Sequence, residues 1–277
     1  MLSLRKQKGL TALVIIILLF LLILFLLPVI WMFLMSIKTR VDALAMPPKW
    51  IFHPTLSNYI SVITNRNFLH GFSNSLVVAA FSLLIALGVG LPAAYAIARF
   101  NFKGKKDIAF WILSTRMAPP ISALIPFYLL FRTLGLTDTR FALVITHITI
   151  NLALVIWMMR SFIQEIPKDL EEAAVIDGCT HFQAFYRIIL PLCVNGIIAT
   201  AILSFVFSWN DLLFGLILSG SHAKTAPVFI ANYNTYEEVL WGQISASGII
   251  VIIPVIVFIG FVQKYLVRGL TFGALKE

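Results

Sequence analysis

The chain has 277 residues, 60% of them hydrophobic and only 12% charged, and its mean hydropathy is +0.95. Soluble domains carry roughly 25% charged residues, so this composition excludes an ordinary soluble protein and predicts a bundle of membrane spans. The formal net charge of +9 does not indicate nucleic-acid binding, because membrane-protein loops collect Lys and Arg and no basic patch is interleaved with aromatic residues.

Six apolar stretches long enough to cross a bilayer follow one another along the chain. The first, 10–37, is too long for a signal-peptide core and is expected to remain as an anchor. The other five are expected at 72–98, 108–131, 141–159, 188–217 and 239–263. The predicted fold is therefore an all-α polytopic membrane protein with six transmembrane helices. Residues 1–277 are expected to form a single transmembrane domain.

The distribution of basic residues predicts the orientation of these spans. If the N-terminus lies inside, the inner segments hold more Lys and Arg than the outer ones, as in most membrane proteins. Six spans place both ends on the same side. The N-terminus and the C-terminal tail, 264–277, are therefore expected in the cytoplasm, and so is the polar loop at about 161–187.

The second span contains a stripe of small residues. Ser82, Ala86, Gly90, Ala94 and Ala98 recur every four residues, so they lie on one face of a helix. Small side chains let two helix backbones approach closely. We expect this face to pack against a neighbouring helix of the same chain, and a subunit interface is the alternative.

Several polar or amphipathic residues interrupt the apolar spans. Such groups are costly in lipid and are often functional. His147 and Asn151 lie one helical turn apart on one face. Asp211 is an acidic residue within the spans and is considered as an ion-pair partner of Arg116. Ion pairs, helix-to-helix hydrogen bonds and packing are the alternative roles. The candidates for a solute pathway are Arg116, His147, Asn151, Trp209, Asn210 and Asp211.

The loop at 161–187 is predicted to form two short helices. Pro167 is a good helix opener, Gly178 can end the first helix with a left-handed cap, and Thr180 and Gln183 form a capping box for the second. Acidic side chains in the first turn of a helix are stabilised by the helix dipole. The loop holds five of the twelve acidic residues of the chain: Glu165, Asp169, Glu171, Glu172 and Asp177. A solvated connecting loop is the alternative to a docking site for another protein.

The same loop carries a specific spacing of residue types. Glu172-Ala173-Ala174 is followed by Gly178, and then by Ile188 and Leu190-Pro191. This pattern resembles the EAA signature of permease subunits of ABC importers. In that family the segment forms a coupling helix that fits into a cleft on a cytoplasmic ATPase subunit. The resemblance assigns ATPase coupling to Glu171, Glu172, Ala173, Ala174, Asp177, Gly178, Ile188, Leu190 and Pro191.

Four further stretches are similar to one branch of that family, the carbohydrate-uptake permeases of the maltose type. They are 114–120, 134–139, 208–211 and 263–276, and the last resembles permeases for sugar alcohols and small sugars. The resemblance implies the type I ABC importer permease fold, with the coupling helix between spans four and five. It also implies a heterodimer with a second homologous permease, two copies of an ABC ATPase subunit, an extracytoplasmic solute-binding protein and a place in the bacterial inner membrane.

The sequence contains no recognisable motif for catalysis, nucleotide binding or metal binding. Gly104-Lys105-Lys106 lacks the upstream glycine and the hydroxyl residue of a phosphate-binding loop, and the cysteines, Cys179 and Cys193, have no neighbouring His ligands. We therefore expect no catalytic site, no metal and no cofactor. The predicted function is one half of the pathway for a sugar or sugar alcohol in an ATP-driven importer. The alternative is an ion-coupled secondary transporter of a small solute, which typically has buried acids in several spans and repeated halves.

Overall fold

The computed structural model describes the backbone of residues 2–234 and 239–272, and the side chains of 11, 13–234 and 239–261. Helices make up most of the described part, whose only strand-like pairing is an isolated bridge between Asn234 and Val239. This confirms the all-α prediction. The chain divides into two compact units, Met1–Arg66 with Ile230–Ile252, and Asn67–Phe229 with Ile253–Glu277.

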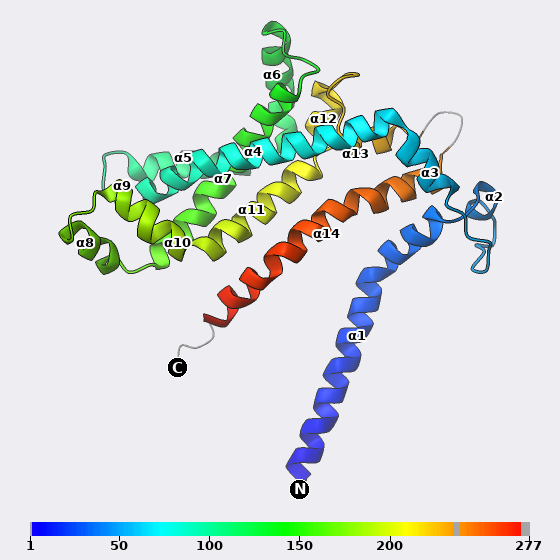
Figure 1. Cartoon of the computed structure of the whole chain (residues 1–277), viewed down its shortest axis with the longest axis horizontal. Helices are drawn as coiled ribbons and strands as arrows, with labels where there is room; N and C mark the ends of the chain where they lie inside the picture. Colours follow the sequence, from blue (N-terminus) through cyan, green and yellow to red (C-terminus); the bar gives the residue numbers. More distant parts are fainter. Residues whose placement is uncertain (1, 235–238, 273–277) are drawn as a thin grey trace. The chain divides into compact units, whose positions relative to one another are not determined.

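The first unit contains the helices α1 (Leu2–Ser36), α2 (Arg40–Ala43) and α3 (Ser57–Thr64), and the beginning of α14 (Trp241–Phe272) (Figure 1). Polar contacts join the end of α1 to the start of α3. The Asn58 side chain donates to the carbonyl oxygens of Ser36 and Lys38, each at 2.9 Å, and the hydroxyl groups of Ser36 and Tyr59 lie 2.7 Å apart. The loop between these helices is therefore anchored at both ends.

The second unit is built on three long helices, α4 (Arg66–Arg99), α7 (Arg140–Glu165) and α11 (Val194–Trp209). The shorter helices around them are α5 (Lys105–Met117), α6 (Pro120–Thr133), α8 (Asp169–Ile176), α9 (His181–Ala184), the π-helix η1 (Phe185–Ile189), α10 (Leu190–Leu192), α12 (Leu213–Leu218) and α13 (Ala226–Ala231). Helices α7 and α11 pack along each other.

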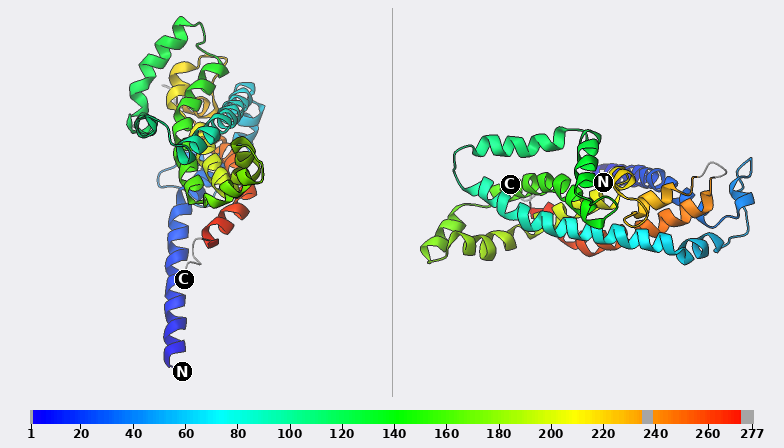
Figure 2. Two further views of the ribbon diagram at one scale, coloured as in Figure 1. Left: turned by 90° about the vertical axis from the view of Figure 1, so that its left-hand side faces the viewer. Right: turned by 90° about the horizontal axis from the view of Figure 1, so that it is seen from above.

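Four helices of the described chain are long and apolar enough to span a membrane: 13–36, 66–99, 140–165 and 241–261. Two further candidates are bent pairs. Helices α5 and α6 meet at 95° (Figure 2), and the helical segment 181–192 meets α11 at 76°. Counting each pair as one span gives the expected six, but the third and fifth spans are not the single helices that the apolar stretches predict.

The two breaks have local causes. Ala118 and Pro119 are extended, and Pro120 opens α6 without an amide hydrogen that could continue α5. Cys193, two residues after Pro191, leaves helical geometry with a ψ of 5°. The fifth helix then ends at Trp209, and α12 is a separate turn within the expected span of 188–217. Helix α7 runs to Glu165, so the beginning of the expected coupling loop is helical.

Small residues bring α4 and α7 into close contact. Ser82, Ala86, Gly90, Ala94 and Ala98 are all buried. A Cβ atom on Gly90 would lie 2.5 Å from Cγ1 of Val155 on α7, so only glycine fits there. This confirms the predicted packing of the stripe against a helix of the same chain. A core cluster that includes Tyr95, Met159 and Phe185 continues this contact toward the polar loop.

Asp138 holds the loop between α12 and α13 in place. Its carboxylate accepts hydrogen bonds from the backbone amides of Gly220, Ser221, His222 and Ala223, at 2.6–3.1 Å. Burial acts to raise the pKa of Asp138, but these four amide donors outweigh it and hold the pKa below its ordinary value. Asp138 itself takes a left-handed conformation with a φ of 58°. The backbone amides of this loop are therefore satisfied by the Asp138 carboxylate and not by regular secondary structure.

We expect Asp138→Asn to lower the thermal unfolding temperature of the purified protein at neutral pH, because an amide oxygen accepts these hydrogen bonds less strongly. The expected cost is about 1–3 kcal/mol. Since the folded-state pKa is lowered, the stabilisation is complete above the unfolded-state pKa of roughly 3.9 and is lost as the pH falls through the folded-state value. Unfolding scans at pH 7 and at about pH 2, well below the unfolded-state pKa, should therefore differ less for the variant than for the wild type. Equal acid sensitivity of the two proteins would contradict the assignment.

Candidate functional site: the polar loop and a pocket between helices

The polar loop folds as the two short helices that its sequence predicts. Helix α8 begins at Asp169 and ends at Ile176, and Gly178 follows with a φ of +90°. Thr180 and Gln183 form both hydrogen bonds of the predicted capping box at the start of α9. The chain then widens into the π-turn η1 before it reaches α10 and α11. The sequence did not indicate this π-turn, which shifts the register of the helix by one residue.

Helix α8 has two different faces. Glu171 and Ala174 are buried against the unit, whereas Glu172, Ala173 and Asp177 are exposed. Ile176 is 85% exposed, although it is among the most hydrophobic residues of the loop. The two adjacent acids therefore differ in burial, with Glu171 covered and Glu172 exposed, although both line one pocket.

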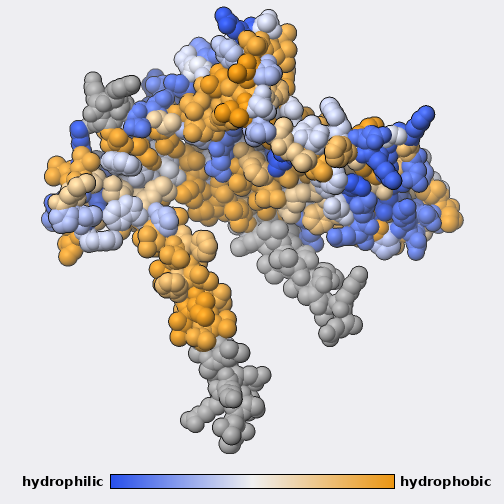
Figure 3. Space-filling model, turned by 180° about the vertical axis from the view of Figure 1, so that it is seen from behind, coloured by the Kyte–Doolittle hydropathy of each residue, from blue (hydrophilic) through white to orange (hydrophobic). Residues whose placement is uncertain are grey.

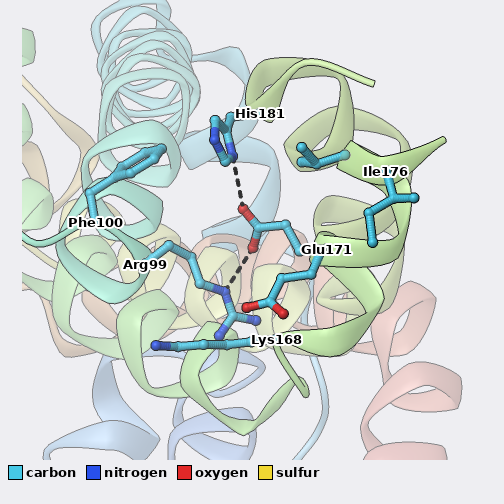
Figure 4. Close-up of a pocket in the computed structure, with 8 residues that line it drawn as sticks. Arg99, Phe100, Lys168, Glu171, Ile176 and His181 are labelled. Carbon is cyan, nitrogen blue, oxygen red and sulfur yellow. Dashed lines mark ion pairs between the residues drawn. The ribbon is translucent and has the colours of Figure 1, made fainter. Parts of the chain in front are cut away.

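Glu171 is the centre of a buried polar cluster (Figure 4). Its Oε2 lies 3.0 Å from Nε of Arg99, as an ion pair without the alignment of a hydrogen bond, and the two side chains are 9% and 5% exposed. Its Oε1 accepts a hydrogen bond from the Tyr95 hydroxyl and lies 3.7 Å from Nδ1 of His181. Arg99 also donates through Nη2 to the carbonyl oxygen of Ile166, at 2.8 Å. One guanidinium thus contacts the residue after α7 and the first turn of α8, from the last residue of α4.

Aromatic side chains pack beside this cluster. The rings of Tyr95 and Phe185 lie 4.7 Å apart, and Phe100 packs edge-on against both Tyr95 and His181. Phe185 and Tyr95 belong to the core cluster shared with α7. The inner side of the loop is therefore seated on the helical bundle by both packing and charge.

The outer side of the loop leaves apolar surface uncovered. Leu170 and Ile176 on α8 are exposed, and so are Phe182 and Tyr186 on the turns that follow it and the acidic Glu172. A pocket of about 370 Å³ opens at Ile176 and Glu172, and its other lining residues are Arg99, Phe100, Lys168, Glu171, Val175 and His181. Figure 3 shows hydrophilic residues gathered at this end of the unit. Apolar side chains inside a hydrophilic surface are typical of a docking site for another protein.

The remaining predicted coupling residues lie where the loop returns to the bundle. Ile188 and Leu190 are half-buried in η1 and α10, and Pro191 is exposed. Ile189, which the pattern does not include, is the fully buried residue of this turn. These residues set the direction in which the chain enters α11, rather than lining the pocket.

A second pocket, of about 190 Å³, lies between α6, α7 and α11. Four of the six candidate pathway residues line it, namely Arg116, His147, Asn151 and Asp211, together with Pro120, Ile150, Phe207, Ser208 and Phe214. The structure thus brings together residues that are far apart in the sequence. Phe207 and Ser208 were not among the predicted pathway residues, although Ser208 begins the stretch 208–211 and Phe207 precedes it.

The polar groups of this pocket are only partly satisfied. Nε2 of His147 lies 3.3 Å from Asp211, and Nδ2 of Asn151 donates to the Ser208 hydroxyl at 2.7 Å. Nδ1 of His147 and Oδ1 of Asn151 are buried and have no hydrogen-bond partner among the described residues. Arg116 lies 5.0 Å over the ring of Phe207, so in the structure the partner of Asp211 is His147.

The other two candidates do not line the pocket. Trp209 is 1% exposed and is packed against the rings of Phe72 and Phe205. Asn210 is exposed, and its side-chain amide donates to the carbonyl oxygen of Val206. Trp209 therefore has the packing role that the sequence left as the alternative.

The chain is similar to proteins of known families. The model of a family described as "Binding-protein-dependent transport system inner membrane component" matches residues 86–272. The trehalose transport system permease protein SugB of Mycobacterium tuberculosis is 40% identical, with 91% of this chain and 92% of the relative covered. A probable ABC transporter permease of Sinorhizobium fredii is 39% identical over 91% of both chains, and the trehalose/maltose permease MalG of Thermococcus litoralis is 34% identical over 91% of both.

Solved structures share the fold. A chain from the crystal structure of a bacterial ABC transporter that imports the acidic polysaccharide alginate superposes with a TM-score of 0.75. It is 24% identical and covers 94% of this chain and 98% of its own length. A chain from the same kind of transporter, in complex with a periplasmic protein bound to an alginate pentasaccharide, has a TM-score of 0.70 at 16% identity, with 94% of both chains covered. The fold is that of the membrane subunits of ABC importers.

Proposed function

The chain belongs to the family of binding-protein-dependent transport system inner membrane components, and from this premise we propose that it forms half of the pathway of an ATP-driven sugar importer. The observation that carries the proposal is the two-faced helix α8. Its inner face is fastened to the bundle through Glu171, while its outer face presents Ile176 and Glu172. A helix that is fixed on one side and uncovered on the other is suited to receive another protein.

The proposed partner at this face is a cytoplasmic ABC ATPase subunit. Apolar anchors such as Ile176 and Phe182 would fill a cleft on that subunit, and the carboxylate of Glu172 would meet a basic group there. Two ATPase copies, a second homologous permease and an extracytoplasmic solute-binding protein complete the proposed assembly. In this arrangement α8, α9 and both chain termini lie in the cytoplasm. The chain itself then hydrolyses no ATP.

The proposed solute is a neutral sugar or a sugar alcohol. Relatives that are 34–40% identical carry the names of trehalose and maltose permeases, which supports this class. The pocket between α6, α7 and α11 supports it on chemical grounds. It offers an aromatic face at Phe207 and hydrogen-bonding groups at Asn151, Ser208 and Asp211, which is the combination that hydroxylated rings require.

The proposal is tested by reconstitution in lipid vesicles. We expect uptake of labelled trehalose, maltose or mannitol only when the chain is combined with its ATPase, its second permease, its binding protein and MgATP. The chain alone should accumulate none of them. Accumulation by the chain alone, driven by an ion gradient, would overturn the proposal in favour of a secondary transporter. Failure of the ATPase to co-purify with the two permeases would contradict the docking role of α8.

A further inference from the structure

We propose that Arg99 and Glu171 form a positioning pair that makes α8 and the end of α4 move as one body. The inference rests on the proposed function, because it concerns how motion at the docking face reaches the membrane helices. It adds a role for the inner face of the loop. The side chains of Glu171 and Arg99 are only 9% and 5% exposed, so they contact each other at the wall of the pocket beside α8 and are mostly withdrawn from the docking face.

The geometry makes Arg99 the junction of three segments. It is the last residue of α4, it contacts Glu171 in the first turn of α8, and it donates to the carbonyl oxygen of Ile166 at the end of α7. That carbonyl group follows the last turn of α7, where a helix leaves its acceptors without partners. A single planar guanidinium with several donors can satisfy both contacts, which the single ammonium group of a lysine would do less rigidly.

Tyr95 joins the same junction one helical turn earlier on α4. Its hydroxyl donates to Glu171 and lies 3.4 Å from the carbonyl oxygen of His181 at the start of α9. The carboxylate of Glu171 is therefore held by two side chains of α4, Tyr95 and Arg99. A displacement of α8 therefore acts directly on the last two turns of α4, without passing through the connecting segments at 100–104 or 166–168.

Burial is the reason why this pair acts as a latch. An exposed ion pair contributes little free energy, so it would not keep two segments together when one of them moves. Removing one partner of a buried pair leaves an uncompensated charge, which is far more costly than the net gain of forming the pair. Separating α8 from the end of α4 therefore carries a large cost in free energy. Helix α4 carries the small-residue stripe that packs on α7, so a movement of its end reaches the core of the unit.

The test is a charge exchange in the assembled complex of both permeases and the ATPase. The variants are Glu171→Arg, Arg99→Glu and the double exchange, with Glu165→Arg as a matched reversal at an exposed acid of the same loop. Amide hydrogen exchange is measured over 169–176 and 90–99, with and without MgATP. Glu171→Gln is the milder variant, which keeps the shape of the side chain and a hydrogen bond to Tyr95.

Each single reversal is expected to raise the exchange rate over 169–176 at least about tenfold, because the buried charge left behind opens the contact. MgATP should then change exchange over 90–99 in the wild type and in Glu165→Arg, but not in the single reversals. The double exchange should restore the response, as expected for two residues that act through each other. Glu171→Gln should give an intermediate response.

Three results would contradict the proposed positioning role of Arg99 and Glu171. They are unchanged exchange in folded single variants, a double variant no better than the worse single variant, or a MgATP response over 90–99 that survives in Glu171→Arg. The docking role is read separately, from retention of the ATPase on the purified complex. If the ATPase is retained while the exchange data fail, only the latch is wrong. If the ATPase does not bind the wild type, the docking proposal fails, and exchange without nucleotide still decides whether the pair positions α8.

Discussion

Replacing Ile176 with Asp is expected to release the ATPase subunits from the complex while the helical bundle stays folded. Ile176 is 85% exposed, so the substitution removes little packing within the chain. At a docking interface the same side chain would fill a cleft, where a carboxylate would be buried without a partner. Loss of a central apolar anchor weakens binding by about 2–4 kcal/mol, and the buried charge adds to this loss. Affinity for the ATPase should therefore fall at least about a hundredfold.

The measurement is retention of the ATPase on the affinity-purified permeases, followed by titration of purified ATPase onto the complex in nanodiscs. The matched control is Ile51→Asp. Ile51 is 94% exposed and lies in the loop between α1 and α3, which we expect on the outer side of the membrane. This control should bind the ATPase like the wild type. Equal loss in both variants would point to general damage, and no loss in Ile176→Asp would contradict docking at the outer face of α8.

Replacing Phe207 with Leu is expected to weaken sugar uptake while leaving the complex assembled. Phe207 is 50% exposed, lines the pocket between α6, α7 and α11, and supports Arg116 on its ring. Leucine keeps much of the volume but removes the flat face on which a sugar ring or the guanidinium can stack. An aromatic or cation–π contact contributes about 1 kcal/mol, so the initial rate of sugar uptake should fall roughly fivefold.

This rate must be measured with the binding protein saturating and fully loaded, so that it reports the permease step. Trehalose, maltose and mannitol serve as probes. Leu203→Ala is the matched control, because Leu203 is an exposed apolar residue on α11 that does not line the pocket. ATP hydrolysis without binding protein should be the same in both variants. If Phe207→Leu transports all three sugars like the wild type, the pocket is not on the pathway.

Local sequence chemistry was sufficient to predict the helices of the polar loop. The acids of the first turn, the left-handed glycine at 178 and the capping box at Thr180 each act within a few residues, so no distant contact is needed. The small-residue stripe on α4 was equally readable, because its period of four describes a helix face. The family resemblance then supplied the docking role, which local chemistry alone leaves open between a docking site and a solvated loop.

The tertiary structure decided which of these residues face inward. Glu171 and Glu172 are adjacent and chemically alike, and only the position of Arg99 on α4 separates a buried partner from an exposed one. The same holds for the pocket. His147, Asn151 and Asp211 are brought together by the packing of α7 on α11, and Trp209 is turned away from them by its contacts with Phe72 and Phe205. Apolar content predicts that a segment lies in the membrane, but helix direction, breaks at proline and side-chain burial depend on contacts between segments that are distant in the chain.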